Sequence, residues 1–306
     1  MAERDLRIIF MGTPEFAVPS LKILVENNYN VVAVVTATDK PAGRGLKLTP
    51  SAVKKYAVEA DIPVLQPSNM KSPEFLAELS SYKPNLGIVV AFRMLPEAVW
   101  KMPEYGTFNL HASLLPDYRG AAPINWAIIN GESKTGITTF FLKHEIDTGD
   151  IMYQEEEPIY PDDNAESLYT RLMTKGAELV LNTVVSIQKG IETTKPQVIS
   201  GTMKSAPKIT KETCKIDWNK PSKEIQNLVR GLSPYPGAWT ILNDKFLKIY
   251  TITPAENVQD SNQTILTDNK TYLFHKTGDG YIAIKDLQME GKKRMTIEEF
   301  LRGNKL

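Results

Sequence analysis

Short apolar runs alternate with amphipathic stretches along the first part of the 306-residue chain. The apolar, β-branched runs predict strands, and the stretches with apolar residues three or four positions apart predict helices. Strands are predicted over residues 6–12, 30–37, 62–67, 84–92 and 106–112, and helices over residues 15–27 and 72–82. This alternation predicts a doubly wound, Rossmann-like α/β domain with a parallel sheet.

The pattern changes after a long helix predicted over residues 164–190 and a polar segment over residues 191–212. A predicted helix at 222–232 precedes five strand-like runs at 237–243, 245–253, 263–267, 271–276 and 280–288, and a helix at 296–303 follows. Short strands separated by turn residues predict a small OB-like antiparallel barrel. We therefore expect a first domain over residues 1–189, a linker over 190–206 and a barrel domain over 207–306.

Composition adds an asymmetry of charge. Lys and Arg together number 36, as do Asp and Glu, but residues 206–306 hold 16 basic against 12 acidic side chains. This excess permits an acidic partner for the C-terminal part. Cys214 is the only cysteine, which excludes an internal disulfide and fits a reducing compartment. No apolar run approaches the roughly 20 residues of a membrane helix, and the N-terminus lacks a secretory pattern, so we expect a cytoplasmic protein.

A polar pair interrupts the last of the predicted parallel strands. Successive strand side chains point to opposite faces, so Asn109 and His111 share one face while Phe108 and Leu110 take the other. The pair is either satisfied by neighbouring backbone groups or belongs to a functional site. Ligands bind outside the carboxyl ends of strands in such sheets, and a turn-rich segment follows directly, which favours a site.

An acidic segment after the strand-like residues 136–142 offers a partner for this histidine. The carboxylate of Asp147, beside a Thr-Gly turn, is placed to return to His111, fix its tautomer and stabilise its charged form. His144 and Glu145 are alternatives for that role. His275 lies in the predicted barrel and is expected to be structural.

An amide, an imidazole and a carboxylate suit a particular chemistry. They can polarise a carbonyl, stabilise an oxyanion and move a proton, whereas Ser113 has no assigned base that would make it a nucleophile. The set therefore predicts acyl transfer between two bound substrates. One histidine with scattered carboxylates does not form a ligand cluster, so we expect no metal. The first β-to-α turn also lacks the G-x-G-x-x-G of a dinucleotide site.

A basic, Gly/Pro-rich segment follows the second predicted strand and lies on the same edge as the polar pair. Lys40, Arg44, Lys47, Lys54 and Lys55 are expected there in one loop. This loop is either a solvated surface feature or a mobile cationic arm that grips a phosphate backbone.

Four stretches together resemble the methionyl-tRNA formyltransferase family: FNLHASLLPDYRGAAPINWAI, DTGDIMYQEEEPI, DKPAGRGLKL and KIDWNKPSKEIQNLVRGLSPYPGAW. The first two are typical of folate-dependent formyltransferases and related hydrolases in general. The last two are typical of the members that act on tRNA. The resemblance extends over both predicted domains, although residues 91–96 read AFRMLP where many members read A-Y-G-x-x-L-P.

The resemblance implies transfer of a formyl group from 10-formyltetrahydrofolate to the amino group of methionine on initiator methionyl-tRNA. It implies catalytic roles for Asn109, His111 and Asp147. It places the folate beside two segments, formed by Phe92, Met94 and Leu95 and by Ser113, Leu114, Leu115 and Pro116. It assigns tRNA contacts to the C-terminal barrel and to Lys40, Arg44 and Lys47. We expect a monomer that does not bind membranes.

Three alternatives remain open from the sequence. A formyltransferase acting on a small amine would share the catalytic residues, but would not account for both the basic loop and the positive barrel. A hydrolase releasing formate from 10-formyltetrahydrofolate would use water as the nucleophile. A catalytically inert RNA-binding module would leave Asn109, His111 and Asp147 with a structural role only.

Overall fold

The computed structural model describes residues 3–42, 47–199, 201–255, 258 and 262–306. The chain forms two compact units, which we describe separately. Unit 1 comprises Met1–Arg119, Gly136–Glu157 and Tyr169–Lys204, and unit 2 comprises Gly120–Thr135, Pro158–Leu168 and Ser205–Leu306.

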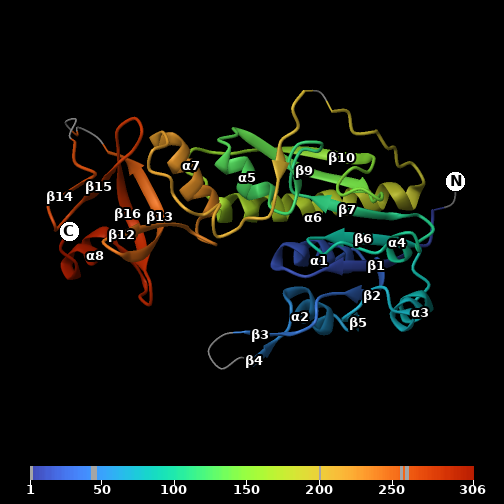
Figure 1. The fold of residues 1–306 in the computed structure, drawn as a ribbon. Helices are drawn as coiled ribbons and strands as arrows, with labels where there is room; N and C mark the ends of the chain where they lie inside the picture. The colour runs from blue at the N-terminus through green and yellow to red at the C-terminus, as the bar shows by residue number, and fades with distance from the viewer. Residues whose placement is uncertain (1–2, 43–46, 200, 256–257, 259–261) are drawn as a thin grey trace. The chain divides into compact units, whose positions relative to one another are not determined.

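Unit 1 is built on a seven-stranded sheet in the order β10-β9-β7-β6-β1-β2-β5 (Figure 1). Five of the strands are parallel and match the predicted runs: β1 (Arg7–Gly12), β2 (Asn30–Val35), β5 (Val64–Leu65), β6 (Leu86–Val90) and β7 (Thr107–His111). Their order is that of a doubly wound fold, because the chain moves outward from β1 first in one direction and then in the other. The predicted fold class is confirmed.

Two further strands make the sheet mixed rather than purely parallel. Strand β9 (Lys134–Phe141) pairs with β7 in the antiparallel direction, and β10 (Ile151–Pro158) forms the edge beyond it. The charged run at residues 155–157 gives β10 little resemblance to a buried strand, and the sequence analysis missed it. An edge strand with one solvated face tolerates such charges: Glu156 is exposed, and the buried Glu157 is paired with Arg171 and Lys175.

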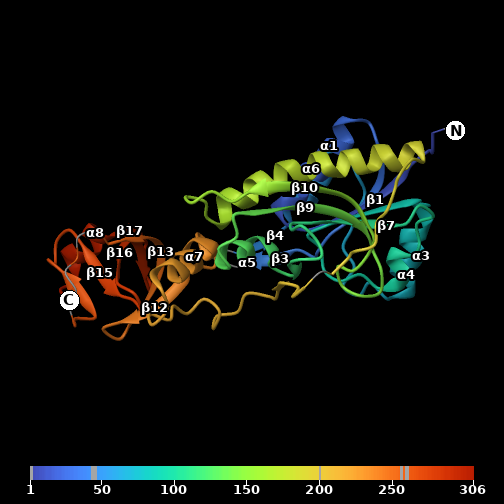
Figure 2. The same ribbon diagram turned by 90° about the horizontal axis from the view of Figure 1, so that it is seen from above.

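Helices cover both faces of this sheet. The helical elements of unit 1 are η1 (Glu15–Ala17), α1 (Val18–Glu26), α2 (Ala52–Glu59), α3 (Pro73–Ser81), α4 (Glu97–Trp100) and the greater part of α6 (Ala165–Lys189). Figure 2 shows α1 and α6 on one side of the sheet and α3 and α4 on the other. On the latter side, Phe75 and Leu79 of α3 and Val99 of α4 pack with Ile9 and Val89.

Close packing of α6 on β7 determines which way the polar pair points. A Cβ at Gly176 of α6 would lie 2.7 Å from Leu110 Cδ2, so the two elements approach closely at this point. The hydroxyls of Thr139 in β9 and Thr183 in α6 are hydrogen-bonded at 2.9 Å. Because side chains alternate along β7, Asn109 and His111 point to the face opposite α6.

The basic segment is only partly a loop, which corrects one sequence-based expectation. Strands β3 (Lys40–Ala42) and β4 (Lys47–Thr49) form an antiparallel hairpin, and α2 begins directly after it with Ser51 as its N-cap. Lys54 lies in α2, and its ammonium binds the Asp39 carboxylate at 2.7 Å. The short apolar face of α2, with Val53 and Ala57 buried, was too weak a helical signal to be recognised between basic residues. Arg44 lies outside the described residues.

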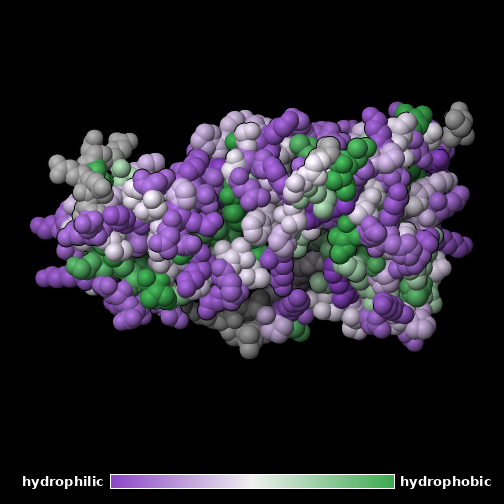
Figure 3. Space-filling view, turned by 45° about the horizontal axis from the view of Figure 1, so that its top comes forward, coloured by the Kyte–Doolittle hydropathy of each residue, from purple (hydrophilic) through white to green (hydrophobic). Residues whose placement is uncertain are grey.

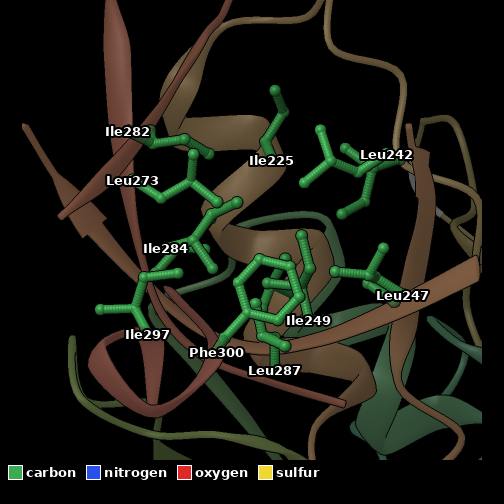
Figure 4. Packing of buried hydrophobic residues seen from close by; sticks show 14 of the residues in the cluster. Ile225, Leu242, Leu247, Ile249, Leu273, Ile282, Ile284, Leu287, Ile297 and Phe300 are labelled. Carbon is green, nitrogen blue, oxygen red and sulfur yellow. The ribbon is translucent and has the colours of Figure 1, made fainter. Parts of the chain in front are cut away.

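Unit 2 contains the predicted antiparallel β domain. Its six-stranded sheet has the order β12-β13-β16-β15-β14 with β17 beside β16, formed by β12 (Ala238–Leu242), β13 (Lys245–Pro254), β14 (Ile265–Thr267), β15 (Leu273–Lys276), β16 (Tyr281–Met289) and β17 (Arg294–Thr296). Helices α7 (Ser222–Leu232) and α8 (Ile297–Gly303) complete it. Figure 4 shows Ile225 of α7, Ile249 of β13, Ile284 of β16 and Phe300 of α8 meeting in its apolar core. Of the strands in this sheet, the three-residue β17 was not predicted from the sequence.

Unit 2 also includes a segment from the first part of the chain. Helix α5 (Pro123–Ile129) packs against α7, and the Asn125 amide donates a hydrogen bond to the Gly231 carbonyl at 2.7 Å. A Cβ at Gly231 would lie 2.7 Å from Ile129 Cγ1. Two-residue strands β8 (Arg119–Gly120) and β11 (Ser205–Ala206) are also present.

The surface is mostly hydrophilic on the face shown in Figure 3, with hydrophobic side chains in separate small areas. The large apolar side chains with the greatest exposure include Met94, Val198, Leu48, Ile191 and Ile146. Within the described part of the chain, no helix combines the length and apolar character needed to span a membrane.

We predict that Glu157→Gln lowers the free energy of unfolding by about 1–3 kcal/mol. The buried Glu157 carboxylate accepts hydrogen bonds from Arg171 and Lys175 of α6, both at 2.7 Å. Burial opposes ionisation of Glu157, but these two cations outweigh it and hold the pKa of the carboxyl below its ordinary value. The stabilisation is therefore complete above the unfolded pKa of about 4.3 and is lost as the pH falls through the lower folded pKa.

Urea unfolding of both proteins as a function of pH measures this contribution. The variant should lose less stability than the parent on acidification. Glu178→Gln is the matched control, because Glu178 is exposed on α6, the helix that carries Arg171 and Lys175. Equal stability of parent and Glu157→Gln at neutral pH would contradict the prediction.

Candidate active site

The polar pair lies at the carboxyl end of β7, at the edge where parallel sheets bind ligands. His111 is buried and Asn109 is half-buried. In the sheet register Asn109 is paired with Val89 of β6 and with Phe140 of β9. Among the described residues, the side-chain amide of Asn109 makes no hydrogen bond, so the structure leaves its donor and acceptor available to a ligand.

His111 has a polar group beside each of its ring nitrogens. Its Nε2 lies 2.9 Å from the Tyr118 carbonyl oxygen, and because a carbonyl can only accept, Nε2 carries the hydrogen. Its Nδ1 faces the Asp147 carboxylate, with 3.9 Å between Nδ1 and Oδ2. The Nδ1 nitrogen is therefore the one at which a proton can be gained or lost. The protonated ring would have an acceptor on each side.

The sequence predicted this pairing of His111 with Asp147, and the other two histidines lie elsewhere. The exposed His144 lies 3.3 Å from Glu97 and meets the edge of the Trp100 ring. His275 belongs to unit 2, where its ring stacks on Trp218 with 3.6 Å between ring centroids. That stacking and its partial burial agree with a structural role.

Asp147 occupies a tight turn after β9. Its φ of +55° lies in the left-handed region, which Asp adopts more readily than most residues. Two residues on, Gly149 lies so close to the end of β9 that a Cβ there would be 1.6 Å from the Phe141 carbonyl oxygen. Only glycine fits this approach, which fixes the path of the turn and the place of Asp147.

The segment after His111 is anchored by its own hydrogen bonds. The Ser113 hydroxyl is fully buried and donates to the Asp117 carbonyl at 2.6 Å, so it is engaged in shaping the loop. Thr138 donates to the Ser113 carbonyl at 2.6 Å and accepts from the Leu115 amide at 3.3 Å. Leu115 is buried, whereas Leu114 and Pro116 are half-buried.

The second segment expected to contact folate has a mixed environment. Phe92 and Leu95 are half-buried and pack against the apolar cluster beneath α3 and α4. Met94 is 72% exposed. The loop begins at Ala91, whose φ of +47° is unusual for a residue with a side chain. Among the described residues, no three His, Cys, Asp or Glu side chains form a group able to hold a metal ion.

Several groups near His111 were missed by the sequence analysis. The Tyr118 group that binds His111 is a backbone carbonyl, which has no signature in sequence. Thr138 lies in β9, whose sequence pattern predicts a buried core strand and gives no sign of a functional residue. Gln197 contacts the Asp147 turn from the segment that was expected to be a polar linker.

Two family models match the chain. A model described as formyl transferase matches residues 6–184, and a model described as formyl transferase, C-terminal domain, matches residues 208–305. The chain belongs to the formyl transferase family. This confirms the resemblance read from the sequence motifs.

Curated relatives within the formyl transferases match over the full length. The chain is 54% identical over 314 residues to the methionyl-tRNA formyltransferase of Phocaeicola vulgatus, covering 99% of this chain and 97% of that protein. It is 51% identical over 317 residues to the methionyl-tRNA formyltransferase of Bacteroides thetaiotaomicron, covering 100% of this chain and 98% of that one.

A solved formyl transferase structure has the same fold at low identity. The N-formyltransferase from Helicobacter canadensis, solved with folinic acid and dTDP-3-aminofucose, matches with a TM-score of 0.67 and 21% identity. The match covers 93% of this chain and 99% of that one.

We predict that Gly149→Ala lowers the kcat of formyl transfer by about 10- to 100-fold, because the added Cβ must displace the turn that presents Asp147. Steady-state kinetics at a temperature where circular dichroism shows a folded protein provide the measurement. Gly303→Ala is the matched control, since a Cβ there meets no atom within 4 Å. Normal turnover of Gly149→Ala would show that the position of this turn does not limit the reaction.

Proposed function

We propose that this chain transfers a formyl group from 10-formyltetrahydrofolate to the amino group of methionine on initiator methionyl-tRNA. The observation that carries the proposal is the His111–Asp147 pair beside the available amide of Asn109, at the ligand edge of a formyl transferase sheet. Relatives about half identical over nearly the whole chain support tRNA as the acceptor.

The roles of the three residues follow from their chemistry. The neutral aminoacyl nitrogen attacks the formyl carbon, a C–N bond forms, and the carbonyl oxygen becomes an oxyanion. The Asn109 amide donates to this oxyanion, such a donor being worth about 3–4 kcal/mol, and the positive charge of His111 protonated at Nδ1 stabilises it further. The attacking nitrogen loses a proton, the bond from carbon to the folate nitrogen breaks, and that nitrogen gains a proton.

Asp147 orients His111 and supports the protonated ring while the proton is relayed. The low exposure of both side chains, 7% and 13%, limits solvent screening between them. The substrate amine is the nucleophile, so the protein needs no activated serine or cysteine. The engaged hydroxyl of Ser113 agrees with this scheme.

The folate is expected along the two segments that flank the polar pair. Residues 113–116 follow His111 directly, and Phe92, Met94 and Leu95 follow β6, the strand next to β7. A pterin contacting backbone groups of these segments would bring the formyl carbon to the carboxyl end of β7.

The tRNA contacts are assigned to the basic hairpin and to the C-terminal part. Lys40 is exposed at the start of β3, and Lys47 begins β4, with Arg44 between them in the sequence. The excess of 16 basic over 12 acidic residues in 206–306 supports a second contact with the phosphate backbone. We assign residues 1–189 to catalysis, 190–206 to a linker and 207–306 to tRNA binding.

We also propose that the protein acts as a monomer in the cytoplasm, where initiator tRNA is charged. Light scattering at micromolar concentration tests the first statement, and a dimer mass would contradict it. Cell fractionation tests the second.

One assay separates this proposal from its rivals. The protein is incubated with 10-formyltetrahydrofolate labelled in the formyl group and with methionyl initiator tRNA, an amino sugar nucleotide or no acceptor. Label recovered in tRNA supports the proposal. Label in the sugar nucleotide indicates a small-amine formyltransferase, and free formate without acceptor indicates a hydrolase.

We predict that His111→Ala reduces formyl transfer by at least about a thousandfold while leaving tRNA binding nearly unchanged. The substitution removes both the positive charge that stabilises the oxyanion and the group that relays the proton. Single-turnover transfer and filter binding of methionyl-tRNA measure the two effects. Normal turnover in a folded variant would refute the catalytic role.

We predict that Arg44→Ala raises the KM for methionyl-tRNA about tenfold and leaves the KM for 10-formyltetrahydrofolate unchanged. Loss of one phosphate contact should also reduce the salt dependence of tRNA binding. Lys71→Ala, at an exposed lysine before α3, is the control. Equal loss for both substrates would contradict a tRNA role for this position.

A further inference from the structure

The side chain of Gln197 is engaged at both ends in the catalytic unit. Its amide nitrogen donates to the carbonyl oxygens of Asp147 and Gly149, each at 2.8 Å. Its amide oxygen accepts from Arg119, at 3.1 Å from Nε and 2.6 Å from Nη2. Gln197 therefore bridges the turn that carries Asp147 and the arginine next to Tyr118.

Those two attachments correspond to the two partners of His111. One ring nitrogen donates to the Tyr118 carbonyl, and the other faces the Asp147 carboxylate. Arg119 follows Tyr118 in the chain, so the path from Tyr118 through Arg119 and Gln197 ends at the backbone of Asp147. The two groups that hold the histidine are thus joined to each other behind it.

The chain around Gln197 is itself fixed on unit 1. Lys195 forms a pair of backbone hydrogen bonds with Ile151 at the start of β10, both at 2.8 Å. Further along, the Lys204 carbonyl accepts from the Tyr118 amide at 2.6 Å, and the Lys204 amide donates to the Asp117 carboxylate at 3.1 Å. Gln197 is therefore presented from a segment anchored on both sides.

We propose that Gln197, oriented by Arg119, is a positioning residue that sets the distance between Asp147 and His111. The proposal rests on the catalytic role proposed above for this pair. The 3.9 Å between Nδ1 and Oδ2 exceeds a hydrogen-bond length, so a small shift of the turn changes how strongly the carboxylate acts on the ring. Misplacement by about 1 Å can reduce a rate about 100-fold.

Two substitutions distinguish the role of the amide nitrogen of Gln197 from that of its amide oxygen. Gln197→Ala removes every contact, whereas Gln197→Glu has the same shape and keeps an acceptor for Arg119 but loses the donors to the Asp147 and Gly149 carbonyls. If Gln197 positions the turn, both variants should lower kcat by about 10- to 100-fold. Their KM for methionyl-tRNA should change less than about threefold. The thermal unfolding midpoint of Gln197→Glu should not lie below that of Gln197→Ala.

Gln188→Ala is the matched control. Gln188 is also half-buried in unit 1, and its side chain accepts a hydrogen bond from the Tyr29 hydroxyl at 3.1 Å, away from the His111 site. This variant should retain kcat. Normal kcat in Gln197→Glu, or a loss of kcat in Gln188→Ala as large as that in Gln197→Ala, would overturn the positioning role.

A double-mutant cycle tests whether Gln197 acts through Asp147. In the Asp147→Asn background, Gln197→Ala should reduce the single-turnover rate by less than about twofold, because the group to be positioned is already disabled. The full 10- to 100-fold loss in that background would overturn the inference and leave the catalytic role of Asp147 intact. Full activity of Asp147→Asn alone would instead refute the proposed role of the pair.

Discussion

Alternation of side chains along β7 is the constraint on which the rest of the catalytic unit depends. Phe108 and Leu110 are buried on the face covered by α6, where Gly176 allows the helix to approach Leu110 closely. Asn109 and His111 consequently point to the other face, at the carboxyl end of the strand. A slip of one residue in the pairing of β7 with β6 and β9 would exchange the two faces and bury the polar pair under α6. The packing that stabilises the core therefore also presents the site.

Much of this could be predicted from the sequence, because it depends on local periodicity. The five parallel strands follow from short continuous apolar runs, and the five main strands of the β domain from short strand-like runs between turn residues. The shared face of Asn109 and His111 follows from the alternation of side chains along a strand. The His111–Asp147 pairing followed from chemistry, since a histidine at a ligand edge needs an orienting carboxylate. The family matches confirm the resemblance carried by the motifs.

The remaining features depend on tertiary contacts that the sequence does not display. The Tyr118 carbonyl is one backbone group among many, and only the folded loop brings it to His111. Helix α2 was not predicted, because its lysines were assigned to the basic loop. In the structure Lys54 is paired with Asp39. Gln197 lies in a polar stretch typical of linkers, and its contacts become visible only when that stretch lies along β10 and the Asp147 turn.

The loops around His111 explain why such a stretch carries an ordered side chain. Tyr118 and Asp147 have φ values of +59° and +55°, and a non-glycine residue in this region costs of order 1 kcal/mol or more. Such turns persist only when neighbouring contacts hold them. Around Asp147 those contacts include the close approach of Gly149 to β9 and the two hydrogen bonds from Gln197. Around Tyr118 they include the hydrogen bond from its amide to the Lys204 carbonyl. A histidine on a rigid strand is positioned precisely only if the loops that carry its partners are also fixed. The geometry of the site therefore depends on the segment that carries Gln197 and Lys204, because it binds both loops.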